Sequence, residues 1–151
     1  METKDILKKL REDNNLTQDQ MAEKVMVTRQ AISRWETGET QPNTDTLKLL
    51  SREYDVSINT LLGAPRQLYC QCCGMPLTED SMISREKDGS FNEDYCMWCY
   101  ADGLFAYSTK DALLDFLMRE MPNPENIPDG ERRRMYDGQL SQLKRWKPAQ
   151  A

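Results

Sequence analysis

The 151-residue chain contains no histidine. Histidine is the usual general base and a member of most catalytic triads, so its absence removes most of that chemistry. The sequence also has no apolar run long enough to cross a bilayer, and its first residues enter an amphipathic pattern without a signal peptide. We therefore expect a cytoplasmic protein that has no membrane partner and is not an enzyme.

No segment of the chain is strongly basic. The formal net charge is −5, from 20 basic and 25 acidic residues, and residues 1–63 alone carry 9 basic and 11 acidic side chains. This balance argues against a protein that coats nucleic acid nonspecifically. Binding to DNA would have to come from a small, local arrangement of side chains.

The first 63 residues predict a compact all-α unit. Apolar residues recur there at helical spacing between residues that cap helices. Thr17 with Gln20 forms a capping-box pattern, and Gly38 suits the left-handed residue after a helix end. Five short helices are expected, starting near residues 4, 17, 28, 44 and 57.

The remainder of the chain has a different character, and Gly63–Arg66 is typical of a linker. Residues 68–107 predict short strands and turns, with a hairpin turn at Asp88-Gly89-Ser90. Helices are expected at 108–121, capped by Ser108 with Asp111, and at 129–147. We predict an α+β protein with two domains, residues 1–63 and 68–151, joined by 64–67; the second consists of 68–107 and C-terminal helices within 108–147.

Four of the five cysteines form two Cys-x-x-Cys pairs separated by 22 residues. Structural disulfides are rare in a cytoplasm, and four thiolates favour tetrahedral zinc. We expect one structural Zn²⁺ per chain; iron in a rubredoxin-like site would use the same ligands, so both metals stay open. Such a closed site leaves no position for a substrate. The predicted ligands are Cys70, Cys73, Cys96 and Cys99.

Cys72 is the fifth cysteine, and two interpretations of it are open. It is either a small structural thiol or a redox-reactive thiol beside the metal.

The segment Val27-Thr-Arg-Gln-Ala-Ile-Ser-Arg-Trp-Glu-Thr-Gly38, preceded by Leu16-Thr-Gln18 and Met21-Ala22, resembles the lambda-repressor-like helix-turn-helix family of bacterial and phage regulators. The resemblance covers residues 4–63 and implies the five-helix fold of that family. It also implies a partly buried ion pair between Arg11 and Glu36. Met26 departs from the family, which commonly has glycine in this turn, and a left-handed backbone there would strain methionine.

In such a motif the second helix lies in the major groove. Ile32 and Trp35 face the core, which leaves a polar face outward. Arginine can bind guanine and glutamine can bind adenine through paired hydrogen bonds, and helix N-termini favour phosphate oxygens. Each side chain could instead be a cap or solvated surface. The candidate base-reading residues are Arg29, Gln30 and Arg34, with Ser33 beside them, and the candidate phosphate contacts are Thr17, Gln18 and Thr28.

The stretches Cys70-Gln-Cys-Cys-Gly-Met-Pro-Leu77 and Tyr95-Cys-Met-Trp-Cys-Tyr-Ala-Asp-Gly-Leu-Phe105 resemble a small bacterial zinc-ribbon domain family. The likeness covers roughly residues 68–147 and includes Leu143-Lys-Arg-Trp-Lys147. It implies the fold and the metal, but no activity.

Our leading hypothesis is a sequence-specific transcriptional regulator that binds double-stranded DNA, as a homodimer on a palindromic operator. The alternatives are a regulator that responds to zinc or to oxidation, and an adaptor that binds a protein partner through the zinc ribbon. No small-molecule effector is indicated. Candidate dimer contacts, which could equally be core residues, are Leu113, Phe116, Leu117, Leu140, Leu143 and Trp146.

Overall fold

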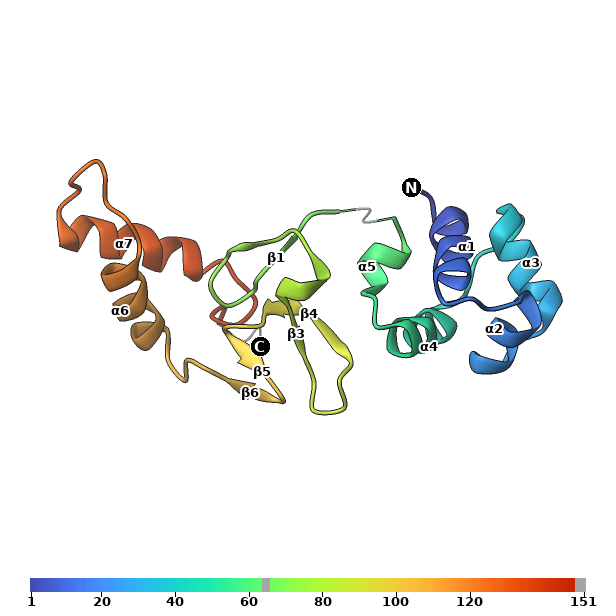
Figure 1. Cartoon of the computed structure of the whole chain (residues 1–151). Coiled ribbons are helices and arrows are strands. Elements are labelled where there is room, and N and C mark those ends of the chain that lie inside the picture. The colour runs from blue at the N-terminus through green and yellow to red at the C-terminus, as the bar shows by residue number, and fades with distance from the viewer. Residues whose placement is uncertain (64–65, 149–151) are drawn as a thin grey trace. The chain divides into compact units, whose positions relative to one another are not determined.

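The structure is a computed structural model that describes residues 1–63 and 66–148. It divides into two compact units, mainly residues 1–63 and 68–148, which are described separately (Figure 1). Residues 64 and 65 of the expected linker, and residues 149–151, lie outside the described residues. The expected α+β class is confirmed. Within the described ranges no helix has the length and apolar character to cross a membrane.

The first unit is all-α, as the capping pattern predicts. Thr17, Thr28, Asn43 and Ser57 each accept a hydrogen bond from the backbone N–H three residues further on. Each such cap stabilises a helix by about 1 kcal/mol. The five helices are α1 Thr3–Asp13, α2 Gln18–Lys24, α3 Arg29–Thr37, α4 Thr44–Tyr54 and α5 Ile58–Leu61.

One apolar cluster joins these helices and fixes the orientation of α3. The largest fully buried side chains of the cluster include Leu7, Met21, Ile32 and Leu50, and Trp35 is only 7 % exposed. Because Ile32 and Trp35 bury one side of a nine-residue helix, its opposite side must face solvent. Core packing therefore decides which residues α3 presents.

The turn between α2 and α3 contains a strained residue. Met26 has φ +56°, and its side chain is 78 % exposed, so no packing accounts for methionine there. The sequence expectation of a left-handed backbone at Met26 is confirmed. This conformation costs a residue with a Cβ about 1 kcal/mol.

The expected ion pair between Arg11 and Glu36 joins α1 to α3. Arg11 Nη2 donates to Glu36 Oε2 at 3.1 Å, Arg11 Nη1 donates to the carbonyl of Leu16 at 3.0 Å, and Gln18 Nε2 donates to Glu36 Oε2 at 3.0 Å. Burial alone would raise the pKa of Glu36. The hydrogen bonds from Arg11 and Gln18 outweigh it and hold this pKa below its ordinary value.

The second unit has three two-stranded antiparallel sheets followed by two helices. The expected turn at Asp88-Gly89-Ser90 joins β3 to β4, with Gly89 at φ +87°. The strands are β1 Leu68–Tyr69 with β2 Pro76–Leu77, β3 Ile83–Arg85 with β4 Phe91–Cys96, and β5 Tyr100–Ala101 with β6 Leu104–Phe105. A 3₁₀ turn spans Asp80–Met82, and the helices are α6 Lys110–Glu120 and α7 Asp129–Leu140.

Two details of the helix predictions are wrong. The N-cap of α6 is Thr109 rather than Ser108, because the Thr109 hydroxyl accepts from the N–H of Ala112 at 3.1 Å. The last helix ends at Leu140 rather than near residue 147. Beyond it, the N–H groups of Lys144 and Arg145 donate to Gln71, at 3.1 and 3.0 Å, and so leave the helical pattern.

We predict that Met26→Gly stabilises the first unit by about 1 kcal/mol, because glycine adopts a positive φ without strain. Urea denaturation followed by circular dichroism measures the change. Met26→Ala is the matched control, since it removes the same side chain but keeps the Cβ. Equal stability of the two variants would contradict the assignment of strain to this turn.

We predict that Glu36→Gln destabilises the protein by about 2 kcal/mol at neutral pH, since it removes a charged hydrogen-bond acceptor of Arg11. The folded pKa of Glu36 is lowered, so the stabilisation exists above the unfolded pKa, about 4.3, and disappears as the pH falls through the folded value. The difference from wild type should shrink in acid. Glu39→Gln, at an exposed carboxylate, should show little loss at either pH.

Candidate nucleic-acid surface and metal centre

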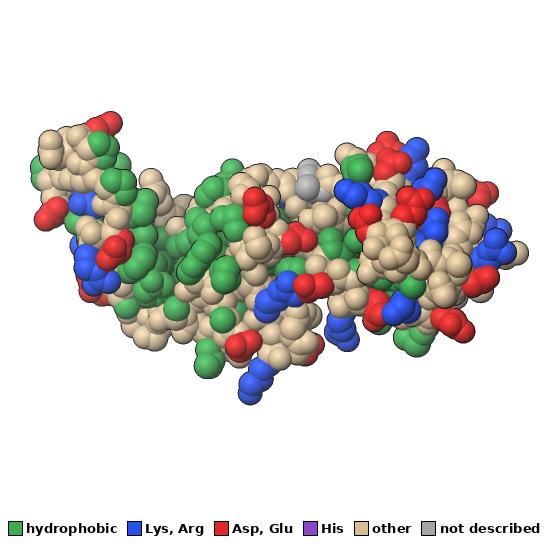
Figure 2. All heavy atoms as spheres, in the orientation of Figure 1, with side chains coloured by type: hydrophobic (Ala, Val, Ile, Leu, Met, Phe, Trp, Pro, Cys, Tyr) green, Lys and Arg blue, Asp and Glu red, His purple; other side chains and the backbone are tan. Residues whose placement is uncertain are grey.

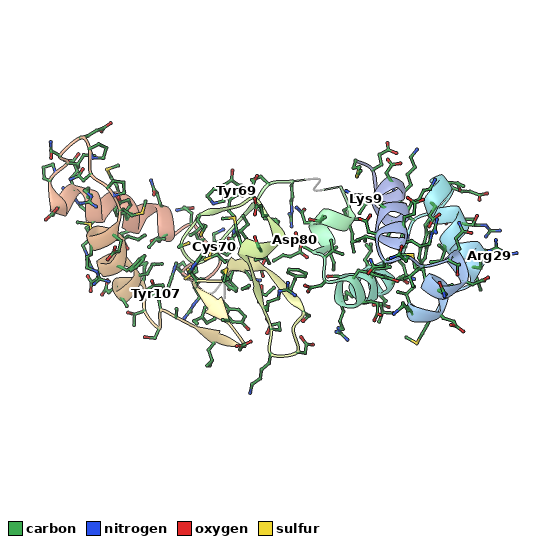
Figure 3. The ribbon with its side chains drawn as sticks, viewed as in Figure 1. Lys9, Arg29, Tyr69, Cys70, Asp80 and Tyr107 are labelled. Carbon is green, nitrogen blue, oxygen red and sulfur yellow. The ribbon has the colours of Figure 1, made fainter. Side chains whose placement is uncertain are left out.

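The outward side of α3 gathers the residues that the sequence singled out. Thr28 caps the helix, and Arg29 and Gln30 stand exposed in its first turn. Figure 3 shows Arg29 directed away from the rest of the first unit. Ser33, half-buried, and Arg34, exposed, follow one helical turn later. Four polar side chains therefore form one continuous stripe on α3.

Arg34 is held only weakly. Its Nε lies 3.8 Å from a carboxylate oxygen of Glu39, and the two side chains are 57 % and 67 % exposed. Exposed pairs of this kind contribute about 0–1 kcal/mol. The guanidinium can therefore leave Glu39 for a stronger partner at little cost.

The three candidate phosphate-contacting residues already have internal bonds. The Thr17 hydroxyl accepts from the N–H of Gln20 at 3.2 Å, and the Thr28 hydroxyl accepts from the N–H of Ala31 at 3.1 Å. In both cases the hydroxyl hydrogen is left to donate. The Gln18 amide donates to Glu36 at 3.0 Å, which uses one of its two N–H groups. All three residues therefore retain a donor.

Acidic side chains beside Arg29 are a feature that sequence reasoning missed. Asp19 and Glu23 line, together with Arg29, a shallow depression of about 350 Å³ between α2 and α3. Figure 2 shows basic and acidic side chains interspersed over the visible face of the first unit. The surface is thus not a uniform basic patch. Its polar stripe offers directed hydrogen bonds rather than a strong positive field.

The four predicted ligand cysteines come together in the second unit. Their sulfur atoms all lie within 4.8 Å of one another, and the Sγ atoms of Cys73 and Cys96 are 3.9 Å apart. A tetrahedral zinc with bonds of about 2.3 Å to sulfur requires edges of about 3.8 Å. The donor set and its spacing therefore fit a tetrahedral metal ion bound by thiolates.

The loop between β1 and β2 carries Cys70 and Cys73, whereas Cys96 ends β4 and Cys99 lies in the loop from β4 to β5. In the first loop, the N–H groups of Cys72 and Cys73 point to the Sγ of Cys70, at 3.4 and 3.5 Å. Gly74 closes the loop at φ +82° and donates to the carbonyl of Cys70 at 2.8 Å. These residues form a metal-binding knuckle, which we call the first knuckle (Cys70–Gly74).

The crowding of the thiols shifts their protonation. Hydrogen bonds from neighbouring thiols, that of Cys73 foremost, lower the pKa of Cys70. The same contacts, with Cys70 foremost, raise the pKa of Cys73 and Cys99. At Cys96 the contact with Cys70 raises the pKa, but the contacts with Cys73 and Cys99 outweigh it and leave this pKa below its ordinary value. Cys73 and Cys99 are therefore the two thiols that resist ionisation. A bound dication would reverse this resistance by stabilising all four negative charges.

Cys72 lies outside the four-sulfur group and is fully buried. Its carbonyl accepts a hydrogen bond from Trp146 Nε1 at 2.8 Å. Burial limits access of an oxidant to its thiol, so the structure favours the interpretation of Cys72 as a structural residue.

Sequence reasoning did not foresee that the C-terminal segment packs on this centre. Leu143 and Trp146, which we considered as dimer contacts, lie against the first knuckle. Leu113 and Leu140, two other candidates, are buried in the second unit at 1 % and 2 % exposure.

Comparison with known families gives two matches. Residues 69–147 match the family described as "Putative zinc ribbon domain", which covers more than half of the chain, and residues 7–61 match the helix-turn-helix family.

Two similar proteins are named as HTH-type regulators. The chain is 47 % identical over 63 residues to the HTH-type transcriptional activator BcrR of Enterococcus faecalis, covering 42 % of this chain and 31 % of that protein. It is 37 % identical over 57 residues to the uncharacterized HTH-type transcriptional regulator YobD of Bacillus subtilis (strain 168), covering 38 % of this chain and 51 % of that protein. The chain thus spans between about a third and a half of these relatives.

A crystal structure of the P22 c2 repressor protein in complex with synthetic operator 9T is also similar. It is 31 % identical, with a TM-score of 0.40, over 41 % of this chain and 94 % of that one.

We predict that Cys73→Ser weakens the binding of Co²⁺ by at least tenfold, because it removes a ligand. Cys72→Ala should retain one tightly bound Co²⁺ per chain. Titration of the thiolate-to-cobalt charge-transfer absorption measures both. Loss of the absorption in Cys72→Ala, with retention in Cys73→Ser, would show that the ligand set is misassigned.

Proposed function

We propose that this chain, which belongs to the zinc ribbon family and carries a helix-turn-helix domain ahead of it, is a sequence-specific DNA-binding transcriptional regulator. The observation that supports the proposal most directly is the exposed polar stripe on α3. Burial of Ile32 and Trp35 leaves Arg29, Gln30 and Arg34 on the opposite side. Two of the similar proteins are named as transcriptional regulators.

In the proposed complex α3 lies in the major groove. Arg29 and Gln30 extend from its first turn, the part of a recognition helix that reaches base edges. Arginine pairs with guanine and glutamine with adenine, each good pair contributing about 1–3 kcal/mol of discrimination. Arg34 reaches the bases by exchanging its weak contact with Glu39 for a guanine.

Uncharged hydrogen-bond donors orient the helix-turn-helix domain on the DNA backbone. The hydroxyl hydrogens of Thr17 and Thr28, and the second N–H of the Gln18 amide, donate to phosphate oxygens. Thr17 and Thr28 are also the N-caps of α2 and α3, where the helix dipoles favour an anion. Because few cations contact phosphates in this arrangement, the salt dependence of binding should be shallow.

The proposed assembly is a homodimer on a palindromic operator. A single nine-residue helix reads few bases, and two copies related by a two-fold axis double the contacts.

The metal of the proposed regulator is one Zn²⁺ per chain, held by Cys70, Cys73, Cys96 and Cys99. Four protein ligands leave no open coordination position, so its role is structural rather than catalytic. The cysteines fix the two loops, and the metal supplies the positive charge that keeps the four thiolates together. The proposed location is the cytoplasm, and iron would use the same four ligands.

A second candidate function is that of a protein-interaction adaptor. Met97 and Trp98, between the last two ligands, are 48 % and 57 % exposed, and Leu104 at the β5–β6 turn is 74 % exposed. These side chains are candidate contacts for a protein partner if they form one continuous apolar patch. In this alternative, loss of the polar stripe on α3 would leave the function intact.

Selection of bound fragments from genomic DNA tests the proposal. At one fixed salt concentration, wild type should enrich a two-fold symmetric site, whereas Arg29→Ala/Gln30→Ala/Arg34→Ala should enrich none, because the base contacts are lost. Lys9→Ala/Lys48→Ala is the matched control: it also removes two positive charges, but from α1 and α4, and should enrich the wild-type site.

Enrichment of the same site by the α3 triple variant would contradict the proposal and favour the adaptor. Enrichment of a single half-site by the wild type, in place of a two-fold symmetric site, would contradict the proposed homodimer but not the proposed DNA binding.

A further inference from the structure

The segment Leu143–Lys147 leaves the helical hairpin of α6 and α7 and covers the first knuckle. The N–H of Arg145 donates to the carbonyl of Gln71 at 3.0 Å. Leu143 Cδ1 lies 3.6 Å from the position that a Cβ on Gly74 would occupy. A segment about 70 residues away in sequence therefore holds the loop that carries two of the four ligands.

Trp146 acts on the peptide group closest to the metal ligands. Its Nε1 donates to the carbonyl of Cys72 at 2.8 Å. The same peptide unit carries the N–H of Cys73, which points to the Sγ of Cys70 at 3.5 Å. The bond from Trp146 thus fixes the plane of this peptide and directs its N–H toward a ligand sulfur. An N–H donor to a ligating sulfur stabilises its negative charge.

Arg145 brings a positive charge to the segment that covers the first knuckle. Its guanidinium lies between two rings, 4.1 Å from the centroid of Phe105 and 4.6 Å from that of Trp146. Its Nε is buried and has no hydrogen-bond partner. Among residues 1–63 and 66–148 no carboxylate pairs with it, whereas the neighbouring Lys144 pairs with Asp94 at 2.7 Å.

A half-buried cation without a counter-ion is unfavourable by itself. Four thiolates around a dication carry a net charge of −2, which is equally unfavourable in a partly buried site. A cation on the segment that covers the first knuckle would offset part of this negative charge.

We propose that two side chains of this segment belong to the metal centre and set its affinity: Trp146 positions the first knuckle and Arg145 balances the charge of the thiolates. This inference rests on the metal site of the proposed function but not on DNA binding. It assigns to the C-terminal segment a role that the ligand cysteines alone do not reveal.

The test is competition for Zn²⁺ between the full chain and a chromophoric chelator. Trp146→Phe keeps a ring for packing but removes the N–H donor, and should weaken Zn²⁺ binding about tenfold, as is typical of residues that orient metal ligands. Lys147→Ala, in the same segment but exposed, is the control and should bind as wild type does.

Arg145 variants separate charge from packing. Arg145→Gln should also weaken Zn²⁺ binding about tenfold, whereas Arg145→Lys, which keeps the charge but loses the planar stacking, should recover most of the affinity. In Co²⁺-loaded protein, Trp146→Phe should shift the thiolate-to-cobalt charge-transfer bands, because the N–H donor to Cys70 is no longer held. A purely structural role predicts neither the rescue nor the shift.

The inference is overturned if Trp146→Phe and Arg145→Gln bind Zn²⁺ within twofold of wild type and leave the cobalt spectrum unchanged. Failure of wild type to bind any metal would instead overturn the metal centre of the proposed function. Circular dichroism of each variant identifies one that has lost its helices, and for such a variant the conservative Arg145→Lys supplies the decisive comparison.

Discussion

The four cysteine sulfurs, all within 4.8 Å of one another, are the constraint on which the second unit depends. Within its described residues, 68–148, no strand exceeds six residues and each sheet has two strands. Isolated sheets of this size are marginal in water. A metal ion bound by both loops ties the hairpins together at one point and supplies folding energy that the apolar contacts cannot. The packing of the C-terminal segment on the first knuckle extends this dependence toward the end of the chain.

The first unit is stabilised by different interactions, namely apolar packing and an ion pair. Its helices share one apolar cluster, and the ion pair of Arg11 with Glu36 ties α1 to α3. Together they fix the rotation of α3 and hence the identity of its outward residues. The proposed DNA-reading surface is in this sense a product of core packing. The metal site lies in the second unit, so the proposed reading of DNA and the binding of metal can be altered separately.

Local signals in the sequence predicted much of this arrangement. The caps at Thr17 and Thr28 follow from residue type and spacing, and the Cys-x-x-Cys pairs predicted the cluster. The left-handed backbone at Met26 followed from the resemblance to a family that commonly has glycine in this turn. The pair of Arg11 and Glu36 followed from the resemblance to a family. The turn between β5 and β6 could have been predicted but was missed. Asp102 and Gly103 both have positive φ there, at 52° and 83°, and an Asp-Gly dipeptide is a strong hairpin signal.

Other features have no local signal. The apolar periodicity predicted a last helix that extends to residue 147, because Leu143 and Trp146 continue its spacing. The chain leaves the helix because Gln71 and the carbonyl of Cys72 offer hydrogen bonds, and residues so distant in sequence cannot be paired by reading a pattern. The bond of Gln18 to Glu36 and the acidic side chains beside Arg29 are likewise consequences of tertiary structure.

The claim that two separate sources of stability support the two units can be tested by one measurement, hydrogen exchange of the full chain before and after removal of the metal by a chelator. We expect amides in β3, β4 and the first knuckle to lose protection, while core amides of α3 and α4 such as those of Ile32 and Leu50 keep theirs. Equal loss in both units, or full protection in both, would contradict the account.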